Sequence, residues 1–432
     1  TFGNHVQEVL ADTAIEHLIE VQIGDMLPTL RGALVNAAVK HLKKMVPDYS
    51  LPQAVAFKNL LRDGARHSLR PAPLSLDDIA VLQYTGGTTG VAKGAMLTHG
   101  NLVANMQQVR ANMQQLDAQG HPVIREGQEV MIAPLPLYHI YAFTVNCMCM
   151  MVTGNHNVLI TNPRDINGFV KELQRWQFSA ILGLNTLFVA LMAHPQFKKV
   201  DFSRLKGTNS GGTALVSAVA ERWKSMTGCT VVEGYGLTET SPVVCANPHG
   251  EHSRLGTVGL PVPGTTLKVI DDEGNALPLG ERGELCVKGP QVMKGYWQRP
   301  EATAEVLDEE GWLRTGDIAV IDQDGFVSIV DRKKDLIIVS GFNVYPNEIE
   351  DVVMAHPKVA ACAAIGVADE KSGEAVKLFV VPSDPTLTQE ELHAYCRENF
   401  TGYKMPRHYV FRDALPMTPV GKILRRELRE SA

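Results

Sequence analysis

A loop rich in glycine and threonine constrains this chain more than any other segment does. It lies in the sequence YTGGTTGVAKGAML, residues 84–97. Glycines let backbone N–H groups approach an anion closely, threonines add hydroxyl donors, and a lysine adds positive charge. The residues of these kinds are Thr85, Gly86, Gly87, Thr88, Thr89, Gly90 and Lys93. So ordered a set of donors predicts a phosphate-binding loop rather than a flexible hairpin.

The loop differs from the Walker A loop of P-loop nucleotide triphosphatases. That motif, GxxxxGK[ST], needs a glycine before the lysine and a hydroxyl residue after it, whereas Ala92 and Gly94 flank Lys93 here. The run IAVLQY predicts a buried strand before the loop, and GAML predicts a short strand after it. A phosphate-binding turn between two strands is therefore expected.

Apolar strands continue to alternate with helices along the chain. Thr98 and Asn101 predict the start of a helix that runs to about Gln115. The segments FSAILGL, LKGTNSGG and CTVVEGYG are apolar runs that end in glycine, threonine or serine. This pattern predicts an α/β fold with a largely parallel sheet, and such sheets bind ligands at the carboxyl ends of their strands.

The pattern changes after about residue 255. Short strands separated by turn residues predict a small β-barrel or antiparallel sheet over about 255–331. The charge cluster DRKKD, residues 331–335, is a candidate hinge. The rest of the chain predicts a small α+β unit, in which Thr388 and Glu391 have the spacing of a capping box.

Composition excludes several classes of protein. The 432 residues predict two or three domains. A net charge of −6 and a pI near 6.2 argue against a general nucleic-acid binder, which needs a basic face. Seven cysteines without zinc spacing predict reduced, mostly buried thiols. The apolar run at 141–152 is too short to span a bilayer.

The segment GYGLTET, residues 234–240, carries side chains that suit a nucleotide. Tyr235 offers a ring to stack on a base, and Thr238 offers a hydroxyl. Glu239 offers a carboxylate suited to Mg²⁺. The alternative is a corner between a strand and a loop that holds a buried tyrosine.

Four other residues are weaker candidates when each is considered alone. Asp317, in GWLRTGDIA, can accept both hydroxyls of a ribose, and Arg332 can support it; the alternative is a surface ion pair of little worth. Lys422 stands after a glycine in a basic tail, which is usually a solvated face. His139 lies among apolar residues, where a core histidine is the more common finding.

Taken together, these motifs resemble the adenylate-forming superfamily of acyl-CoA synthetases, luciferases and peptide-synthetase adenylation domains. YTGGTTGVAKG, GYGLTE, TGD, DRKKD and PVGK occur in the family's order and approximate spacing. The segment GWLRTGDIAVIDQDGFVSIVDRKK is similar to the fatty acyl-CoA synthetase signature. Essentially the whole chain is similar to bacterial long-chain fatty acid–CoA ligases, and Ala214 departs from their usual proline.

The resemblance implies roles for matching positions. It implies that the glycine- and threonine-rich loop with Lys93 binds the β- and γ-phosphates of ATP, and that Glu239 binds Mg²⁺. It implies that Lys422 is the catalytic lysine of adenylation and that His139 lies beside the reacting carboxylate. The other implied positions are adenine and acyl-pocket contacts at Gly211, Gly212, Thr213, Gly234 and Tyr235, an α-phosphate contact at Thr238, ribose contacts at Asp317 and Arg332, a hinge at Lys334, and a loop for the second half-reaction at Gly341.

The implied reaction joins a long-chain fatty acid to CoA through acyl-AMP, in fatty acid uptake and degradation. The implied fold is a large domain of α/β layers plus a small β-barrel over 1–331, a hinge over 332–334, and a mobile α+β domain over 335–432. Family members have a substantial segment before the position that Thr1 matches, so we expect a truncated chain.

Several alternatives stay open. A medium-chain or aryl acid–CoA ligase would use the same machinery, and a fragment without the N-terminal segment would bind nucleotide without turnover. The expected partners are fatty acid, ATP and CoA, with no nucleic acid. The expected location is cytoplasmic, and both a peripheral contact with the inner membrane and a homodimer stay open.

Overall fold

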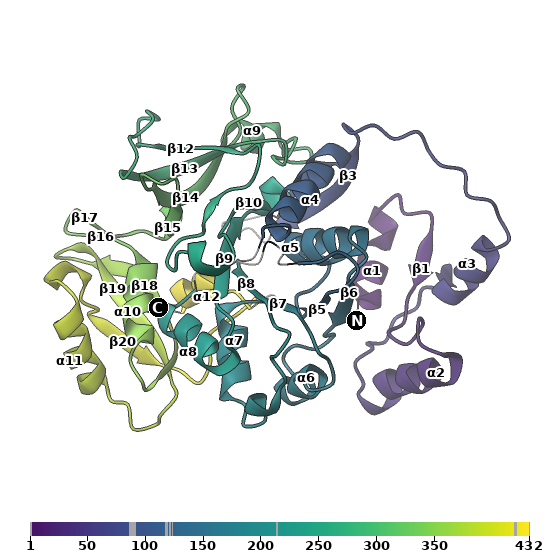
Figure 1. Cartoon of the computed structure of the whole chain (residues 1–432), viewed down its shortest axis with the longest axis horizontal. Helices are drawn as coiled ribbons and strands as arrows, with labels where there is room; N and C mark the ends of the chain where they lie inside the picture. The colour runs from purple at the N-terminus through teal and green to yellow at the C-terminus, as the bar shows by residue number, and fades with distance from the viewer. Residues whose placement is uncertain are drawn as a thin grey trace. The chain divides into compact units, whose positions relative to one another are not determined.

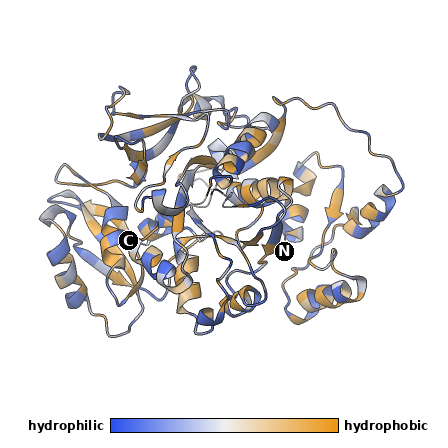
Figure 2. Ribbon diagram, viewed as in Figure 1, coloured by the Kyte–Doolittle hydropathy of each residue, from blue (hydrophilic) through white to orange (hydrophobic). Residues whose placement is uncertain are grey.

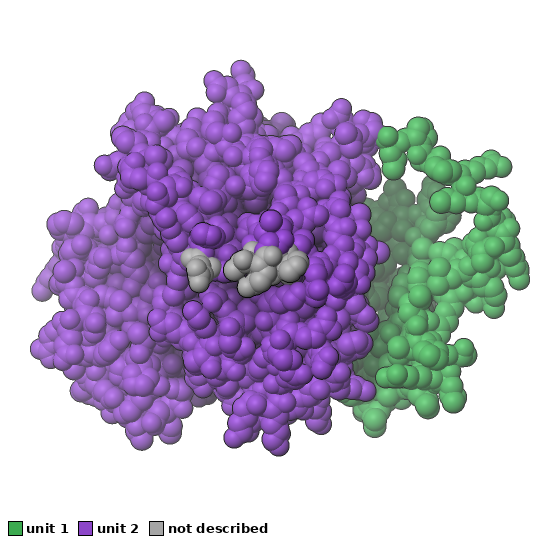
Figure 3. All heavy atoms as spheres, viewed as in Figure 1, with its two compact units in different colours: residues 1–74 green, residues 75–432 purple. Residues whose placement is uncertain are grey.

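The computed structural model describes residues 2–85, 92–116, 120, 122, 124–212, 215–418 and 421–431. The chain forms two compact units, Thr1–Leu74 and Ser75–Ala432 (Figure 3). The first unit holds a short parallel pair of strands and three helices. Its elements are α1 (Gly3–Val9), β1 (Leu18–Glu20), α2 (Thr29–Ala37), β2 (Ala54–Ala56) and α3 (Phe57–Gly64).

The centre of the second unit is a seven-stranded sheet (Figure 1). Neighbouring strands follow the order β11–β10–β9–β8–β7–β5–β6, and the five from β9 to β6 run parallel. The largely parallel sheet predicted from the sequence is therefore confirmed. The strands are β5 (Val130–Ala133), β6 (His156–Leu159), β7 (Ala180–Gly183), β8 (Gly207–Gly211), β9 (Val231–Gly236), β10 (Val243–Ala246) and β11 (Leu260–Pro261).

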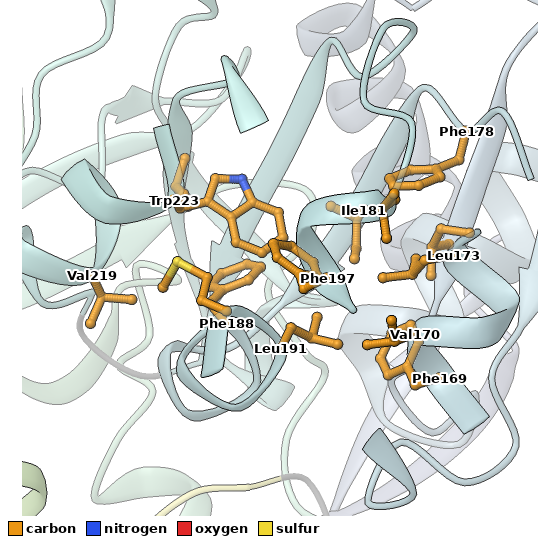
Figure 4. Close-up of a cluster of buried hydrophobic side chains, with 14 of the residues drawn as sticks. Phe169, Val170, Leu173, Phe178, Ile181, Phe188, Leu191, Phe197, Val219 and Trp223 are labelled. Carbon is orange, nitrogen blue, oxygen red and sulfur yellow. The ribbon is translucent and has the colours of Figure 1, made fainter. Parts of the chain in front are cut away.

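Helices cover both faces of this sheet. On one face, Trp223, Phe188 and Phe197 are fully buried and pack together (Figure 4). Each buried aromatic side chain contributes roughly 2–3 kcal/mol through removal of apolar surface from water. The helices of this face are α6 (Ile166–Leu173), α7 (Asn185–Ala193) and α8 (Ser217–Thr227), and those of the other are α4 (His99–Met113), α5 (Ile140–Ala142) and the π-helix Phe143–Met150.

The strands that flank the glycine- and threonine-rich loop form a separate two-stranded sheet. They are β3 (Ile79–Thr85) and β4 (Lys93–Thr98), and Thr85 pairs with Lys93. The prediction that β3 is a buried strand is wrong in its burial, since Leu82 is 38% exposed and Tyr84 57% exposed. The reason is that β3 pairs with β4 alone, outside the seven-stranded sheet.

An antiparallel sheet follows, with strand order β12–β13–β14–β15. The antiparallel sheet is thus confirmed, while a closed barrel is not, because the described strands leave two ends. Its strands are β12 (Thr266–Ile270), β13 (Arg282–Lys288), β14 (Leu313–Ile321) and β15 (Val327–Arg332), with α9 (Pro300–Ala304) before β14.

The last part of the chain is an α+β unit, as predicted. Figure 2 shows hydrophobic colour along its strands and hydrophilic colour on α11. The Thr388 hydroxyl caps α11 by accepting from the Glu391 backbone N–H at 3.2 Å. Its elements are β16 (Ile337–Val339), β17 (Phe342–Val344), α10 (Pro346–Met354), β18 (Val359–Asp369), β19 (Gly373–Pro382), α11 (Gln389–Asn399), β20 (His408–Phe411) and α12 (Arg425–Glu430).

The structure also bears on the cysteines and on possible membrane-spanning helices. All seven cysteines are free, and all except Cys147 are buried. Among the described residues, we find no helix with the length and apolar character needed to cross a bilayer.

Candidate active site

The carboxyl ends of β8 and β9 bring two predicted site segments together. Gly211, at the end of β8, pairs with Gly234 in β9, and Tyr235 follows directly. A Cβ atom at Gly211 would lie 3.1 Å from the ring of Tyr141, so a larger residue here would require that ring to shift by a few tenths of an ångström. Thr213 lies outside the described residues.

Asp317 is the buried polar centre of this region, with only 3% of its surface exposed. The Tyr235 hydroxyl donates to Asp317 Oδ2 at 2.5 Å, and Arg332 Nε lies 3.2 Å from Oδ1. The register of β14 and β15 places Asp317 opposite Arg332. Burial raises the pKa of Asp317, and Arg332 opposes that rise. The Asp317 carboxylate is therefore buried, whereas the Arg332 side chain that compensates its charge is 47% exposed. The pair differs in this way from an ion pair with both partners on the surface.

Lys422 lies against the same region, although it is distant in sequence. A Cβ atom at Gly212 would lie 3.2 Å from Lys422 Cε, and Gly212 has a positive φ of 87°. The Lys422 backbone N–H donates to Thr418 Oγ1 at 3.0 Å. A side chain at Gly212 would be strained by the positive φ and would require the end of the lysine to shift by a few tenths of an ångström.

Burial and Arg332 lower the pKa of Lys422, while Asp317 and Glu239 act in the opposite direction. The electrostatic surroundings of the lysine therefore come from three separate parts of the chain. It is not the solvated basic tail considered as the alternative.

His139 is the residue before α5, and its Nδ1 accepts from the Tyr141 backbone N–H at 3.3 Å. Burial, with a further effect from Lys422, lowers the pKa of His139 to about 4. The imidazole is therefore neutral at pH 7. Because Nδ1 is an acceptor, the proton of the neutral ring is on Nε2.

The phosphate-binding loop itself is only partly described. Thr85 is the last residue of β3, and Lys93 is the first residue of β4. The predicted loop residues that lie outside the described residues are Gly86, Gly87, Thr88, Thr89 and Gly90. Both strands contact the short helix Thr238–Thr240, which carries Glu239. The base of the loop and the candidate magnesium ligand are thus neighbours.

Tyr296 connects Lys93 to Glu239. Its hydroxyl donates to Glu239 Oε1 at 2.7 Å, and Lys93 Nζ lies 5.1 Å from the centre of its ring. Tyr296 and Glu239 also line a cavity of about 200 Å³. Tyr296 is not among the site residues predicted from the sequence, where the segment GYW that contains it was the available signal.

Two predicted positions lie in the connection to the last unit. Lys334 falls in the 3₁₀ turn Lys333–Asp335, between β15 and β16. Gly341 is at the turn between β16 and β17, where a Cβ atom would meet no described atom within 4 Å.

A magnesium ion fits the donors that are present. Among the described residues, no group of three or more histidine, cysteine, aspartate or glutamate side chains forms a metal cluster. Glu239 is a single carboxylate beside the candidate phosphate loop. Proteins commonly bind Mg²⁺ through one or two carboxylates, together with substrate phosphates and water, and not through a full set of protein ligands. A single carboxylate beside a predicted phosphate loop is consistent with this mode of binding.

The chain was also compared with known proteins and protein families. The model of the AMP-binding enzyme family matches residues 3–297, and that of the AMP-binding enzyme C-terminal domain matches residues 348–422. A long-chain-fatty-acid–CoA ligase from Escherichia coli O6:H1 is 53% identical over 431 residues, which are 100% of this chain and 75% of that protein.

Two solved structures are similar over almost the whole chain. ATP-bound MatB from Rhodopseudomonas palustris has a TM-score of 0.81 and 29% identity, and covers 99% of this chain and 81% of that one. The anthranilate CoA ligase AuaEII in complex with anthranoyl-AMP has a TM-score of 0.84 and 25% identity, and covers 100% and 76%.

Proposed function

The chain belongs to the AMP-binding enzyme family, and from this premise we propose that it is a long-chain fatty acid–CoA ligase that forms acyl-AMP from ATP. The observation that carries the proposal is the convergence of Lys422, Asp317 and Glu239 on one site beside the candidate phosphate loop. The 53% identity with the fatty acid ligase over the whole chain supports the choice of substrate.

In the first step, a fatty acid carboxylate oxygen attacks the α-phosphorus of ATP and pyrophosphate leaves. This brings an anion to a polyanion, and two unit charges 4 Å apart repel by about 4 kcal/mol at an effective dielectric near 20. Lys422, Lys93 and the loop donors oppose that repulsion, and they do so most strongly when charge builds up in the transition state. Thr238 contacts the α-phosphate.

The remaining side chains orient the substrates. Asp317 accepts from the ribose hydroxyls while Arg332 compensates its charge, and Tyr235 stacks on adenine beside Gly234. Gly211 and Gly212 leave room for the adenine and the acyl group. Neutral His139 donates from Nε2 to a carboxylate oxygen of the fatty acid. Mg²⁺ held by Glu239 supplies charge neutralisation at the phosphates.

In the second step, the CoA thiol attacks the acyl carbonyl carbon and AMP leaves. A lysine directed at the α-phosphate occupies space that the thiol needs, so we infer that the domain 335–432 rotates about Lys334. The large domain is 1–331, and residues 332–334 are the hinge. The rotation withdraws Lys422 and brings Gly341 to the site. The short 3₁₀ turn Lys333–Asp335 lies between β15 and β16 and belongs to neither strand, which supports a hinge here.

A panel of carboxylic acids tests this function directly. The purified chain is incubated with ATP, Mg²⁺ and CoA, and acyl-CoA is measured by mass spectrometry. We expect the highest kcat/KM for long-chain fatty acids. A preference for aryl or medium-chain acids would identify the alternative ligase, and ATP binding without acyl-AMP formation would identify a nucleotide-binding fragment.

We further propose a cytoplasmic enzyme that contacts the inner face of the membrane, because its substrate partitions there. Flotation with anionic liposomes tests this contact, and a protein that stays in the heavy fraction would contradict it.

A further inference from the structure

We propose that Tyr296 is a positioning residue that sets the orientation of Glu239 toward the metal–ATP complex. The proposal rests on the proposed function, because that function makes Glu239 a metal ligand. Tyr296 touches two groups of the candidate phosphate site at once, Lys93 through its ring and Glu239 through its hydroxyl.

The hydroxyl acts as a donor to Glu239. A tyrosine phenol has an ordinary pKa of about 10 and keeps its proton at neutral pH. A hydroxyl has one proton, and here it goes to Glu239 Oε1 at 2.7 Å. This bond holds one carboxylate oxygen and thereby restricts the rotation of the Glu239 carboxylate.

The backbone around Tyr296 is fixed on both sides. The Met293 N–H donates to the Glu239 carbonyl at 2.8 Å, and the Trp297 N–H donates to the Gly94 carbonyl at 2.8 Å. The Tyr296 N–H donates to Thr303 Oγ1 at 2.9 Å. The segment that contains Tyr296 is therefore hydrogen-bonded both to β4, which follows the predicted phosphate loop, and to the short helix that carries Glu239.

The ring has a second task. Lys93 Nζ lies 5.1 Å from its centre, within the range of a cation–π contact. Tyr296 is 8% exposed, so this contact is largely shielded from water. One side chain thus contacts both the cation at the base of the loop and the carboxylate of Glu239.

Tyr296→Phe separates the two tasks, since it keeps the ring and removes the hydroxyl. We measure the Kd for ATP by calorimetry, once with Mg²⁺ and once with EDTA. The variant should bind ATP about tenfold more weakly with Mg²⁺, the effect of losing a hydrogen bond to a charged group. Its Kd in EDTA should be unchanged. Tyr296→Leu should weaken binding in both conditions, because Lys93 also loses its ring.

Two further variants make the test specific. Tyr409→Phe, which removes another tyrosine hydroxyl that lies 3.1 Å from His393 Nδ1, should leave both Kd values unchanged. Glu239→Gln combined with Tyr296→Phe should bind Mg²⁺–ATP no more weakly than Glu239→Gln alone. Equal weakening with and without Mg²⁺, or no change in Tyr296→Phe, would overturn the proposal. A wild-type chain that makes no acyl-AMP would instead refute the proposed function.

Discussion

Lys422 is the residue on which the two half-reactions should separate. It lies against Gly212 and near Asp317, and in the proposed reaction its charge serves only adenylation. We expect Lys422→Ala to slow acyl-AMP formation by about a hundredfold or more, the usual cost of removing one preorganised charge. Thioester formation from supplied acyl-AMP should stay near the wild-type rate. Pyrophosphate exchange and single-turnover thioester assays measure the two steps.

Lys377→Ala is the matched control for this variant. Lys377 belongs to the same unit, and its Nζ lies 5.6 Å from the ring centre of Phe379. Both half-reactions should survive its removal. If Lys422→Ala slows the two half-reactions equally, the lysine acts on both and the two-orientation scheme is wrong.

The protonation of His139 should make the stability of the protein depend on pH, and NMR can follow this protonation at a single ring proton. Its pKa of about 4 lies below the ordinary 6.5, so the unfolded chain takes up this proton first as the pH falls. The stability from His139 is therefore complete above about pH 6.5 and is lost between 6.5 and 4. The NMR signal of its ring Cε1–H should titrate near pH 4.

Urea unfolding at pH 7 and pH 5 gives an independent measurement of the same effect. The free energy of unfolding should fall more over this interval in the wild type than in His139→Gln. In Lys422→Ala, the NMR midpoint should rise only in part, because burial has the larger effect on the pKa. A wild-type midpoint near 6.5 would contradict the buried, neutral imidazole.

Among the elements, α4 shows what a local signal predicts well. The Thr98 hydroxyl accepts from the Asn101 N–H at 3.1 Å, and Asn101 Oδ1 accepts from the Thr98 N–H at 3.0 Å. Thr98→Val keeps the shape and removes the acceptor, so we expect a loss of about 1 kcal/mol in stability. Chemical denaturation measures it, with Ser225→Ala, an exposed site on α8, as the control. An unchanged midpoint would show that the cap contributes nothing.

Such caps and the parallel strands were predictable because their causes lie within a few residues. The burial of β3 was not, since the pattern of IAVLQY does not reveal that the strand pairs with β4 alone. The opposite charges of Asp317 and Arg332 were enough to predict that Arg332 could support Asp317. The register of β14 and β15, which places the two residues opposite each other, could not be predicted from the sequence. Tyr296 was missed because its partner Glu239 is 57 positions away and comes near only in the folded chain.

For the molecule as a whole, an ion pair and a cation–π contact of Arg282 join the antiparallel sheet to the last unit in the orientation that places Lys422 beside Gly212. Arg282 Nη1 on β13 lies 3.3 Å from Glu348 Oε1 on α10, and its guanidinium lies 4.6 Å from the ring centre of Tyr345. Lys404 holds the other oxygen of Glu348 at 2.6 Å. Any rotation of the last unit must break the contact between Arg282 and Glu348.

We therefore expect Arg282→Glu to favour the second orientation. Acyl-AMP formation should fall by up to about fivefold, because an exposed pair contributes roughly 0–1 kcal/mol, while thioester formation from supplied acyl-AMP should not fall. The double variant Arg282→Glu with Glu348→Arg should recover part of the loss. Both half-reactions are measured at 0.05 and at 1 M salt. Since salt screens exposed charges, the difference between wild type and Arg282→Glu should shrink at 1 M. A loss shared equally by both half-reactions, or one that the charge swap does not reduce, would show that Arg282 stabilises the fold and does not select between orientations.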